Sequence, residues 1–173
     1  MIPQDLNEII REVLGLLHSE LQIQKVRPII HLAPNLPKVN GDRVRLQQVL
    51  INLIVNACDA MATKPTPTRQ ITIETQEVGG GFVQASVADL GTGFNLQDSR
   101  EVFEPFRTTK PQGLGLGLPI CRSIIESHGG RLSVSNNGYG GAIVRFTVRV
   151  ESEVKVPLVS PQRPVEAVPS APL

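Results

Sequence analysis

The residues of this chain with the strongest chemical signal are three glycines that alternate with leucines, Gly113, Gly115 and Gly117. Glycine lets the backbone approach a ligand closely, so that successive N–H groups can face an anion. Pro119 suits the first turn of a helix that would begin there, and the N-terminus of such a helix adds partial positive charge. The pattern therefore predicts a phosphate-binding loop, with a flexible loop ahead of a helix as the alternative interpretation.

A polar stripe on one predicted helix is the second chemical signal. Gln48, Asn52 and Asn56 follow one another at helical spacing, and Asp59 comes close to the same stripe. Asparagine is a poor residue for the middle of a helix, and its amide oxygen is a suitable ligand for Mg²⁺. The stripe predicts a polar wall that contacts a ligand, and a solvated surface is the alternative.

The third signal is the segment Asp89-Leu90-Gly91-Thr92-Gly93, which directly follows a predicted strand. A carboxylate at a strand end can accept a hydrogen bond from the exocyclic amine of a base, and the two glycines let a flat ring lie against the backbone. The alternative is an Asx-type turn that ends the strand. The chain has neither the GxxxxGK[ST] phosphate loop nor the GxGxxG spacing, so a nucleotide would be bound in another geometry.

The elements that must position these residues are predicted from hydrophobic periodicity and turn residues. Pro28 indicates either that the first predicted strand lies at a sheet edge or that Pro28 lies at the beginning of the strand. Asp42 suits the N-cap of the second helix. Residues 33–41 are expected to form a loop, and the long segment 89–117 a functional lid. We expect helices at 5–25, 42–62 and 118–128, and strands at 26–32, 70–78, 82–88, 131–136 and 142–150.

Antiparallel hairpins and segregated helices in this order indicate an α+β fold. The expected architecture is a two-layer α/β sandwich, with a mixed sheet of about five strands packed on three helices. We expect the domain to occupy residues 1–152, followed by a proline-rich linker or disordered tail at 153–173.

Composition excludes several classes of function. The 173 residues carry a formal net charge of +1, which gives no electrostatic footprint for nucleic acid or an anionic membrane. No apolar run approaches the ~20 residues that span a bilayer. Cys58 and Cys121 lie within predicted helices, and we interpret them as buried reduced thiols, which fits the cytoplasm.

Taken in order, the motifs resemble those of the ATP-binding catalytic domain of bacterial sensor histidine kinases. This is a Bergerat-fold domain with a flexible ATP lid, related more distantly to gyrase and the mismatch-repair ATPases. The segments FEPFRTTK and ICRSIIESHGG resemble the nitrogen-regulation and oxygen-sensing type in particular. The four matching motifs are Asn52-Leu53-Ile54-Val55-Asn56-Ala57 (N box), Asp89-Leu90-Gly91-Thr92-Gly93 (first glycine box), Phe103-Glu104-Pro105-Phe106 (F box) and Gly113-Leu114-Gly115-Leu116-Gly117-Leu118 (second glycine box).

The resemblance implies roles for individual residues. Asn56 would coordinate the Mg²⁺ that bridges the phosphates of ATP, and Asn52 would contact the phosphate side one turn earlier. Asp89 would recognise the adenine amine, above a floor formed by Gly91 and Gly93.

Further residues implied by the resemblance lie in or near the lid and in the last strand. Lys110 would neutralise charge on the terminal phosphate, with Arg107 as a helper. Thr147 would reach the adenine through water. The predicted ATP-binding set is completed by the backbone of Gly113, Gly115 and Gly117 and by Asp59, Thr108, Thr109, Leu114, Leu116 and Leu118.

The residue one turn before the metal-binding asparagine indicates whether such a domain transfers the phosphoryl group of ATP or hydrolyses ATP. In hydrolytic relatives it is a glutamate that activates water, whereas here it is Asn52, which cannot be a general base. The resemblance therefore implies a protein-histidine kinase domain that holds Mg–ATP and delivers the γ-phosphoryl group to another domain's histidine. Two alternatives stay open: a nucleotide-binding regulatory module without phosphotransfer, and a gyrase-like ATPase.

The acceptor histidine is not apparent in this chain. No acidic-aliphatic pattern or Asn-Pro pair follows His18, and we expect structural or exposed roles for His18, His31 and His128. We therefore expect an excised fragment whose partners are a dimerisation and phosphoacceptor domain of the parent protein and a downstream response regulator. Contact with nucleic acid or directly with a membrane is not expected. The expected location is the cytoplasm, either free or as the cytoplasmic part of a membrane-bound sensor.

Overall fold

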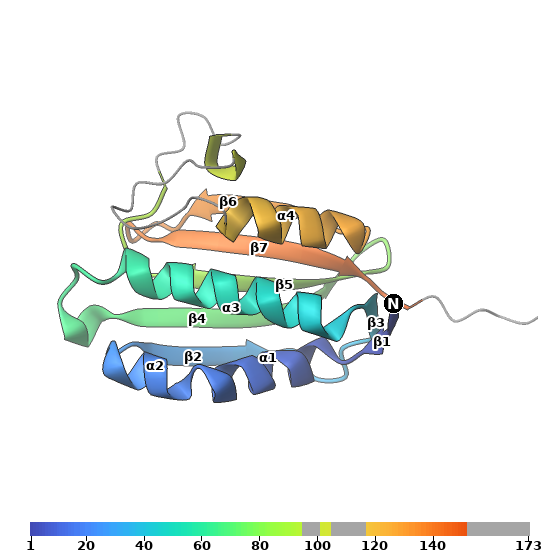
Figure 1. Ribbon diagram of the computed structural model, residues 1–173, viewed down its shortest axis with the longest axis horizontal. Helices are drawn as coiled ribbons and strands as arrows, with labels where there is room; N and C mark the ends of the chain where they lie inside the picture. The colour runs from blue at the N-terminus through green and yellow to red at the C-terminus, as the bar shows by residue number, and fades with distance from the viewer. Residues whose placement is uncertain (95–100, 105–116, 152–173) are drawn as a thin grey trace, which may run out of the picture.

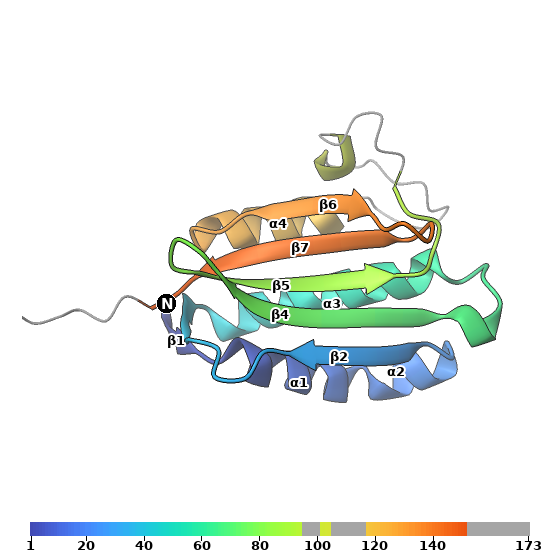
Figure 2. The same cartoon turned by 180° about the vertical axis from the view of Figure 1, so that it is seen from behind.

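The computed structural model describes residues 1–94, 101–104 and 117–151, and these residues form two layers. Figure 1 shows the helices in front of the main sheet, and Figure 2 shows, from behind, the sheet face that none of the described helices covers. The predicted two-layer sandwich is confirmed. The predicted tail at 153–173 and most of the predicted lid lie outside the described residues. Within the described ranges, no helix is long and apolar enough to cross a membrane.

The elements agree with the sequence prediction except within residues 1–25 and 33–41 and at two short 3-10 turns. The helices are α1 (Leu6–Leu16), α2 (His18–Ile23), α3 (Arg43–Ala60) and α4 (Gly117–Ser127), with short 3-10 turns at Thr66–Thr68 and Glu101–Phe103. The strands are β1 (Ile2–Gln4), β2 (Arg27–Leu32), β3 (Val39–Gly41), β4 (Gln70–Val78), β5 (Phe82–Asp89), β6 (Leu132–Asn136) and β7 (Ala142–Arg149).

The main sheet has five strands in the order β2-β4-β5-β7-β6. Strand β2 pairs with β4 in parallel, and the other pairs are antiparallel, which confirms the predicted mixed sheet. Strand β2 lies at an edge, which is one of the two alternatives that Pro28 indicates. Because β5 is the central strand, its last residue, Asp89, lies between the ends of β4 and β7.

Helices α1 and α3 each begin at an aspartate. The Asp5 carboxylate accepts the N–H of Glu8 at 3.0 Å, and the Asp42 carboxylate accepts the N–H of Arg45 at 3.1 Å. Both are N-caps, which satisfy a backbone donor that has no partner within the helix. The predicted start of the second helix at Asp42 is thereby confirmed.

The prediction of one helix at 5–25 is wrong. The chain forms α1 and α2 with a break at Leu17, whose backbone leaves the helical region. Gly15 lies in the last turn of α1, where a glycine weakens the helix. Leu16, which would lie on the apolar side of one continuous helix, is 69% exposed.

The prediction of a loop throughout 33–41 is also wrong. Val39–Gly41 forms β3, which pairs with β1 in a separate two-stranded sheet. Strands of three residues are too short for alternation to reveal them in the sequence. This small sheet is connected to the main one, because Val39 forms a bridge with Val150 just beyond β7.

The core lies between the helices and the covered face of the main sheet. Its largest aromatic side chain is Phe146, which is fully buried, and the rest of the core is mostly aliphatic. Burial of this aliphatic surface is the main favourable contribution to folding. The helical spacing of the apolar residues in the second helix predicts a buried face, and each member of that face is at most 4% exposed: Val49, Leu50, Leu53, Ile54, Ala57 and Met61.

His128 connects the end of α4 to the start of α3. Its side chain is 3% exposed, and its Nε2 accepts the N–H of Asp42 at 2.9 Å. Its Nδ1 lies 2.7 Å from the carbonyl oxygen of Ile124, so Nδ1 carries the proton and donates. The structural role predicted for His128 is confirmed, and His18 and His31 are exposed.

His128→Ala should lower the free energy of unfolding by about 1–3 kcal/mol, because it removes a buried side chain and leaves the backbone N–H of Asp42 without its partner. Urea denaturation followed by circular dichroism measures the change. His31→Ala, at an exposed histidine of β2, is the matched control and should change the free energy by less than about 0.5 kcal/mol. Equal losses in the two variants would contradict the role assigned to His128.

Candidate functional site

Asp89 is a buried carboxylate at the end of the central strand. Its side chain is 6% exposed, and its Oδ1 accepts the backbone N–H of Gly91 at 2.7 Å and of Ala142 at 3.2 Å. Burial raises the pKa of the Asp89 carboxyl above its ordinary value, and the two backbone hydrogen bonds act in the opposite direction. Among the described residues, both hydrogen bonds to the carboxylate use Oδ1. Oδ2 is therefore the oxygen that a donor on a ligand can engage.

The chain after Asp89 packs directly against the end of α3. A Cβ atom on Gly91 would lie 2.7 Å from the carbonyl oxygen of Ala60 and 2.7 Å from Oδ1 of Asp89, so only glycine fits. Gly93 has φ of +70°, a conformation that side chains rarely adopt. The structure thus explains why both positions of the DLGTG segment are glycine: side chains would not fit where this backbone passes beside the carboxylate.

Asn52 and Asn56 lie on the side of α3 that faces α4. The Nδ2 atom of Asn56 is 3.3 Å from where a Cβ on Gly117 would be. The Asn52 amide hydrogen-bonds with the thiol of Cys121, which also lies 3.8 Å from the carbonyl oxygen of Val49. Both asparagines are half-buried, so the solvated-surface alternative does not apply to them.

Helices α3 and α4 run antiparallel, side by side (Figure 1). Asn52 contacts Cys121, whereas Asn56, further along α3, contacts Gly117 at the start of α4. The N-terminus of α4 therefore lies at the same end of α3 as Ala60, which touches Gly91. A helix N-terminus carries partial positive charge and attracts anions. Asp89, Asn56 and this terminus therefore lie at the same end of the domain.

The sequence also predicted other residues for the polar stripe and the ATP-binding set. Gln48 and Asp59 are exposed on α3, and Leu118 packs against the core at the start of α4. The remaining predicted lid residues lie outside the described residues and stay predictions: Arg107, Thr108, Thr109, Lys110, Gly113, Leu114, Gly115 and Leu116.

Thr147 does not lie near Asp89. Its hydroxyl accepts the N–H of Arg131 at 3.0 Å. Strand β7 meets Asp89 at Ala142, and the rise of a strand places Thr147 about 17 Å further along. Strand alternation also directs the side chain of Thr147 to the opposite face of the sheet. The prediction that Thr147 reaches the adenine is therefore withdrawn, and the group beside the carboxylate is the backbone N–H of Ala142.

Sequence reasoning missed the contribution of the turn between β6 and β7. The composition of residues 136–141, NNGYGG, indicates only a turn, yet Asn137 donates to the carbonyl oxygen of Asp89 at 2.6 Å. The N–H of Ala142, which bonds the Asp89 carboxylate, follows this turn directly. Two consecutive asparagines in a tight hairpin were the available signal, because their side chains bond backbone groups readily.

The two cysteines are free and buried, as predicted. Burial raises the pKa of the Cys58 thiol to about 11 and that of the Cys121 thiol to about 11. Both thiols are therefore protonated and unreactive at neutral pH.

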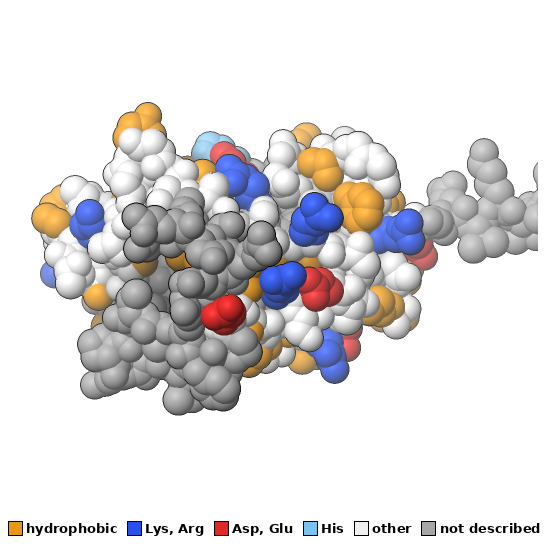
Figure 3. All heavy atoms as spheres, turned by 90° about the horizontal axis from the view of Figure 1, so that it is seen from above, with side chains coloured by type: hydrophobic (Ala, Val, Ile, Leu, Met, Phe, Trp, Pro, Cys, Tyr) orange, Lys and Arg blue, Asp and Glu red, His pale blue; other side chains and the backbone are white. Residues whose placement is uncertain are grey.

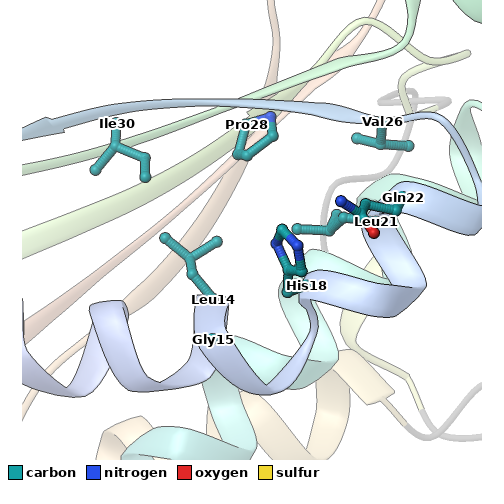
Figure 4. Close-up of a pocket in the computed structure, with 8 residues that line it drawn as sticks. All are labelled: Leu14, Gly15, His18, Leu21, Gln22, Val26, Pro28 and Ile30. Carbon is teal, nitrogen blue, oxygen red and sulfur yellow. The ribbon is translucent and has the colours of Figure 1, made fainter.

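A groove of about 510 Å³ lies elsewhere, between α1, α2 and β2. Figure 4 shows its apolar side chains, with His18 at one side, in the space between the helices and the edge strand. Strand β4 separates β2 from the strand that ends at Asp89, so the groove is distinct from the site. Its lining residues are Leu14, Gly15, His18, Leu21, Gln22, Val26, Pro28 and Ile30.

Charged side chains of both signs are interspersed on the described part of the face seen in Figure 3. On α4, for example, Arg122 pairs with Glu126 at 2.8 Å and also lies over the ring of Phe103, 5.2 Å from its centroid. This mixture differs from the single-sign field of a nucleic-acid-binding surface.

Comparison with known families identifies the domain. Residues 41–152, more than half of the chain, match the family model described as "Histidine kinase-, DNA gyrase B-, and HSP90-like ATPase". The chain belongs to this ATPase family. Among curated proteins it is similar to sensor proteins: it is 39% identical over 149 residues to the sensor protein TdiS of Thauera aromatica. It is 37% identical over 150 residues to the sensor protein FixL of Bradyrhizobium diazoefficiens.

Solved structures show which members of the ATPase family the domain resembles. The catalytic domain of histidine kinase ThkA matches with a TM-score of 0.74 at 34% identity, over 86% of this chain and 95% of that one. ThkA in complex with the response regulator TrrA matches with a TM-score of 0.73 at 31% identity, over 87% of this chain and 42% of that one. The chain is thus an ATP-binding catalytic domain of the sensor histidine kinase type, as its motifs indicate. It spans 27% of TdiS and 29% of FixL, so it corresponds to one part of these longer relatives.

Gly91→Ala should lower the free energy of unfolding by about 1–3 kcal/mol, because the added methyl group overlaps the Ala60 carbonyl and the Asp89 carboxylate. Gly79→Ala is the control, since a Cβ there meets nothing within 4 Å. Urea denaturation of the two variants provides the comparison. A Gly91→Ala domain as stable as the Gly79→Ala domain would show that the backbone is not packed as described.

Proposed function

We propose that this domain binds Mg–ATP at the end of β5 and transfers the γ-phosphoryl group to a histidine of a dimerisation domain in its parent protein. The observation that carries the proposal is the buried Asp89 carboxylate, held through Oδ1 by two backbone N–H groups beside the end of α3. A fixed anionic acceptor in a site with little water is suited to the exocyclic amine of adenine. Membership of the ATPase family supports ATP as the nucleotide.

Asn56 supplies the protein ligand for Mg²⁺ in this proposal. Its half-buried amide lies beside Gly117, where the N-terminus of α4 favours phosphates. Within the described part of the chain, no group of three His, Cys, Asp or Glu side chains could hold a metal ion. An amide oxygen supplemented by phosphates and water fits Mg²⁺, which keeps several waters, better than it fits a transition metal. Bound Mg²⁺ would supply charge neutralisation at the phosphates.

Asn52 favours transfer over hydrolysis. Its amide has no basicity, and its neighbour Cys121 has a thiol pKa of about 11, so neither group can activate water as a base or thiolate at neutral pH. ATP bound here would await a stronger nucleophile, the imidazole of a partner domain. Phosphoryl transfer depends mainly on positioning and charge neutralisation, and Lys110 and Arg107 are the proposed cations for the phosphates.

The proposed partners follow from this scheme. The acceptor histidine belongs to a dimerisation domain of the parent protein, and a response regulator receives the phosphoryl group next. A relative, ThkA, is known in complex with the response regulator TrrA, which supports this arrangement. The proposed location is the cytoplasm, free or as part of a membrane-bound sensor, in agreement with two free cysteines.

Asp89→Asn should weaken binding of the ATP analogue AMP-PNP by about tenfold or more. The amide can still accept from Gly91 and Ala142, but it presents its NH₂ group to the adenine amine. The variant should also lose its preference over GMP-PNP, because that NH₂ group can donate to the guanine O6. Calorimetric titration with Mg²⁺ present measures both affinities. Glu77→Gln, at an exposed carboxylate of β4, is the control; unaltered AMP-PNP binding by Asp89→Asn would remove Asp89 from the site.

Transfer itself is tested with radiolabelled ATP and a separately produced phosphoacceptor domain of a sensor histidine kinase. We expect acid-labile phosphohistidine on that domain, none on this chain, and the same result with His18→Ala. ATP binding without transfer would favour the regulatory-module alternative. Steady release of inorganic phosphate without an acceptor would favour the gyrase-like ATPase.

A further inference from the structure

We propose that the turn joining β6 and β7, together with the last residue of β6 (residues 136–141), determines the choice of base by holding Asp89 in position, with Asn136 and Asn137 as the positioning residues. This inference rests on the proposed role of Asp89 in binding adenine. It adds to the site a segment that lies more than 40 residues further along the chain than the carboxylate it holds.

Asn137 ties the turn to the main chain of Asp89. Its Nδ2 donates to the carbonyl oxygen of Asp89 at 2.6 Å. Its Oδ1 accepts the backbone N–H groups of Tyr139 at 3.0 Å and of Gly141 at 2.9 Å. One amide group therefore folds the turn and fixes the residue that carries the carboxylate, so that neither can shift without the other.

Asn136 holds the other end of the same segment. Its Oδ1 accepts the N–H of Phe94 at 2.7 Å, and its Nδ2 donates to the carbonyl oxygen of Phe94 at 2.7 Å. The side chain thus pairs with the backbone as a neighbouring strand would. Gly93 permits this approach, because a Cβ there would lie 2.9 Å from Oδ1 of Asn136.

The contacts converge on one orientation of the carboxylate. Ala142, the first residue of β7, donates to Oδ1 of Asp89, while Asn137 binds the carbonyl of the same residue. Since Oδ1 is fixed from the hairpin, the direction of Oδ2 is fixed as well. Discrimination between an amine and a carbonyl on the base needs an acceptor held in place, because a mobile carboxylate could turn away from the wrong base.

Replacing each asparagine by aspartate removes the side-chain hydrogen-bond donor and keeps the acceptor, so the two contributions can be measured separately. Asn137→Asp keeps an acceptor for Tyr139 and Gly141 but removes the donor to the Asp89 carbonyl. Asn136→Asp likewise keeps the bond from the Phe94 N–H and loses the bond to its carbonyl. The alanine variants at both positions form a second pair without added charge. Tyr139→Ala is the matched control, because this side chain of the same turn is 89% exposed.

Three ligands are titrated calorimetrically with Mg²⁺ present: AMP-PNP, GMP-PNP and inorganic tripolyphosphate. Thermal unfolding of each variant is measured alongside. The wild-type domain should prefer AMP-PNP over GMP-PNP. The Asn136 and Asn137 variants should bind AMP-PNP about tenfold more weakly, the effect expected from one hydrogen bond, and lose much of that preference. Their affinity for tripolyphosphate, which has no base, should stay that of the wild type and of Tyr139→Ala.

The outcomes distinguish this inference from the function on which it rests. A wild-type domain that does not distinguish AMP-PNP from GMP-PNP would overturn the adenine role of Asp89 itself. A selective wild type with unchanged asparagine variants would overturn only the inference. Equal weakening of all three ligands, together with a lower unfolding temperature, would show that the turn merely stabilises the fold and would also overturn it.

Discussion

A carboxylate buried at the end of a central strand must be compensated by fixed hydrogen-bond donors, and the rest of the site depends on how this is done. Burial alone raises the pKa of Asp89, so the ionised form is costly without partners. The protein provides two backbone N–H groups, one from the following turn and one from β7. Each donor requires close packing: the turn needs a glycine at position 91, and the start of β7 needs the hairpin before it. The glycines, the hairpin and the end of α3 are therefore parts of one arrangement.

The antiparallel contact between α3 and α4 adds the second half of the site. His128 fixes the two helices at one end through the N–H of Asp42, and Asn56 meets Gly117 at the other. This pairing puts the N-terminus of α4, next to the amide of Asn56, at the same end of α3 as Gly91. In the proposed function, base recognition and phosphate binding would be performed by different elements, whose relative position is set by helix packing. In the proposed function, the separation lets one domain hold ATP firmly while its terminal phosphate faces a partner.

Much of the fold followed from local chemistry in the sequence. Asp42 and the apolar period after it predicted α3, and alternation gave the limits of β4 correctly. The break at Leu17 and the three-residue β3 were missed, because short elements are decided by tertiary packing more than by pattern. In the site, side-chain types pointed to Asp89 and Asn56. The Ala142 N–H could not be found that way, because every residue type except proline offers a backbone donor and only the register of β7 brings this one to Asp89.

The most direct test of the account is a map of nucleotide binding on the isotope-labelled domain, followed through its backbone amide resonances as Mg–AMP-PNP is added. We expect shifts concentrated at Asn56, Gly91 and Ala142, where the two halves of the site meet. Resonances of Gly15 beside the α1–β2 groove, and of His31 on the edge strand, should stay in place. Shifts confined to that groove, with Gly91 and Ala142 unchanged, would contradict the central claim that the end of β5 is the nucleotide site.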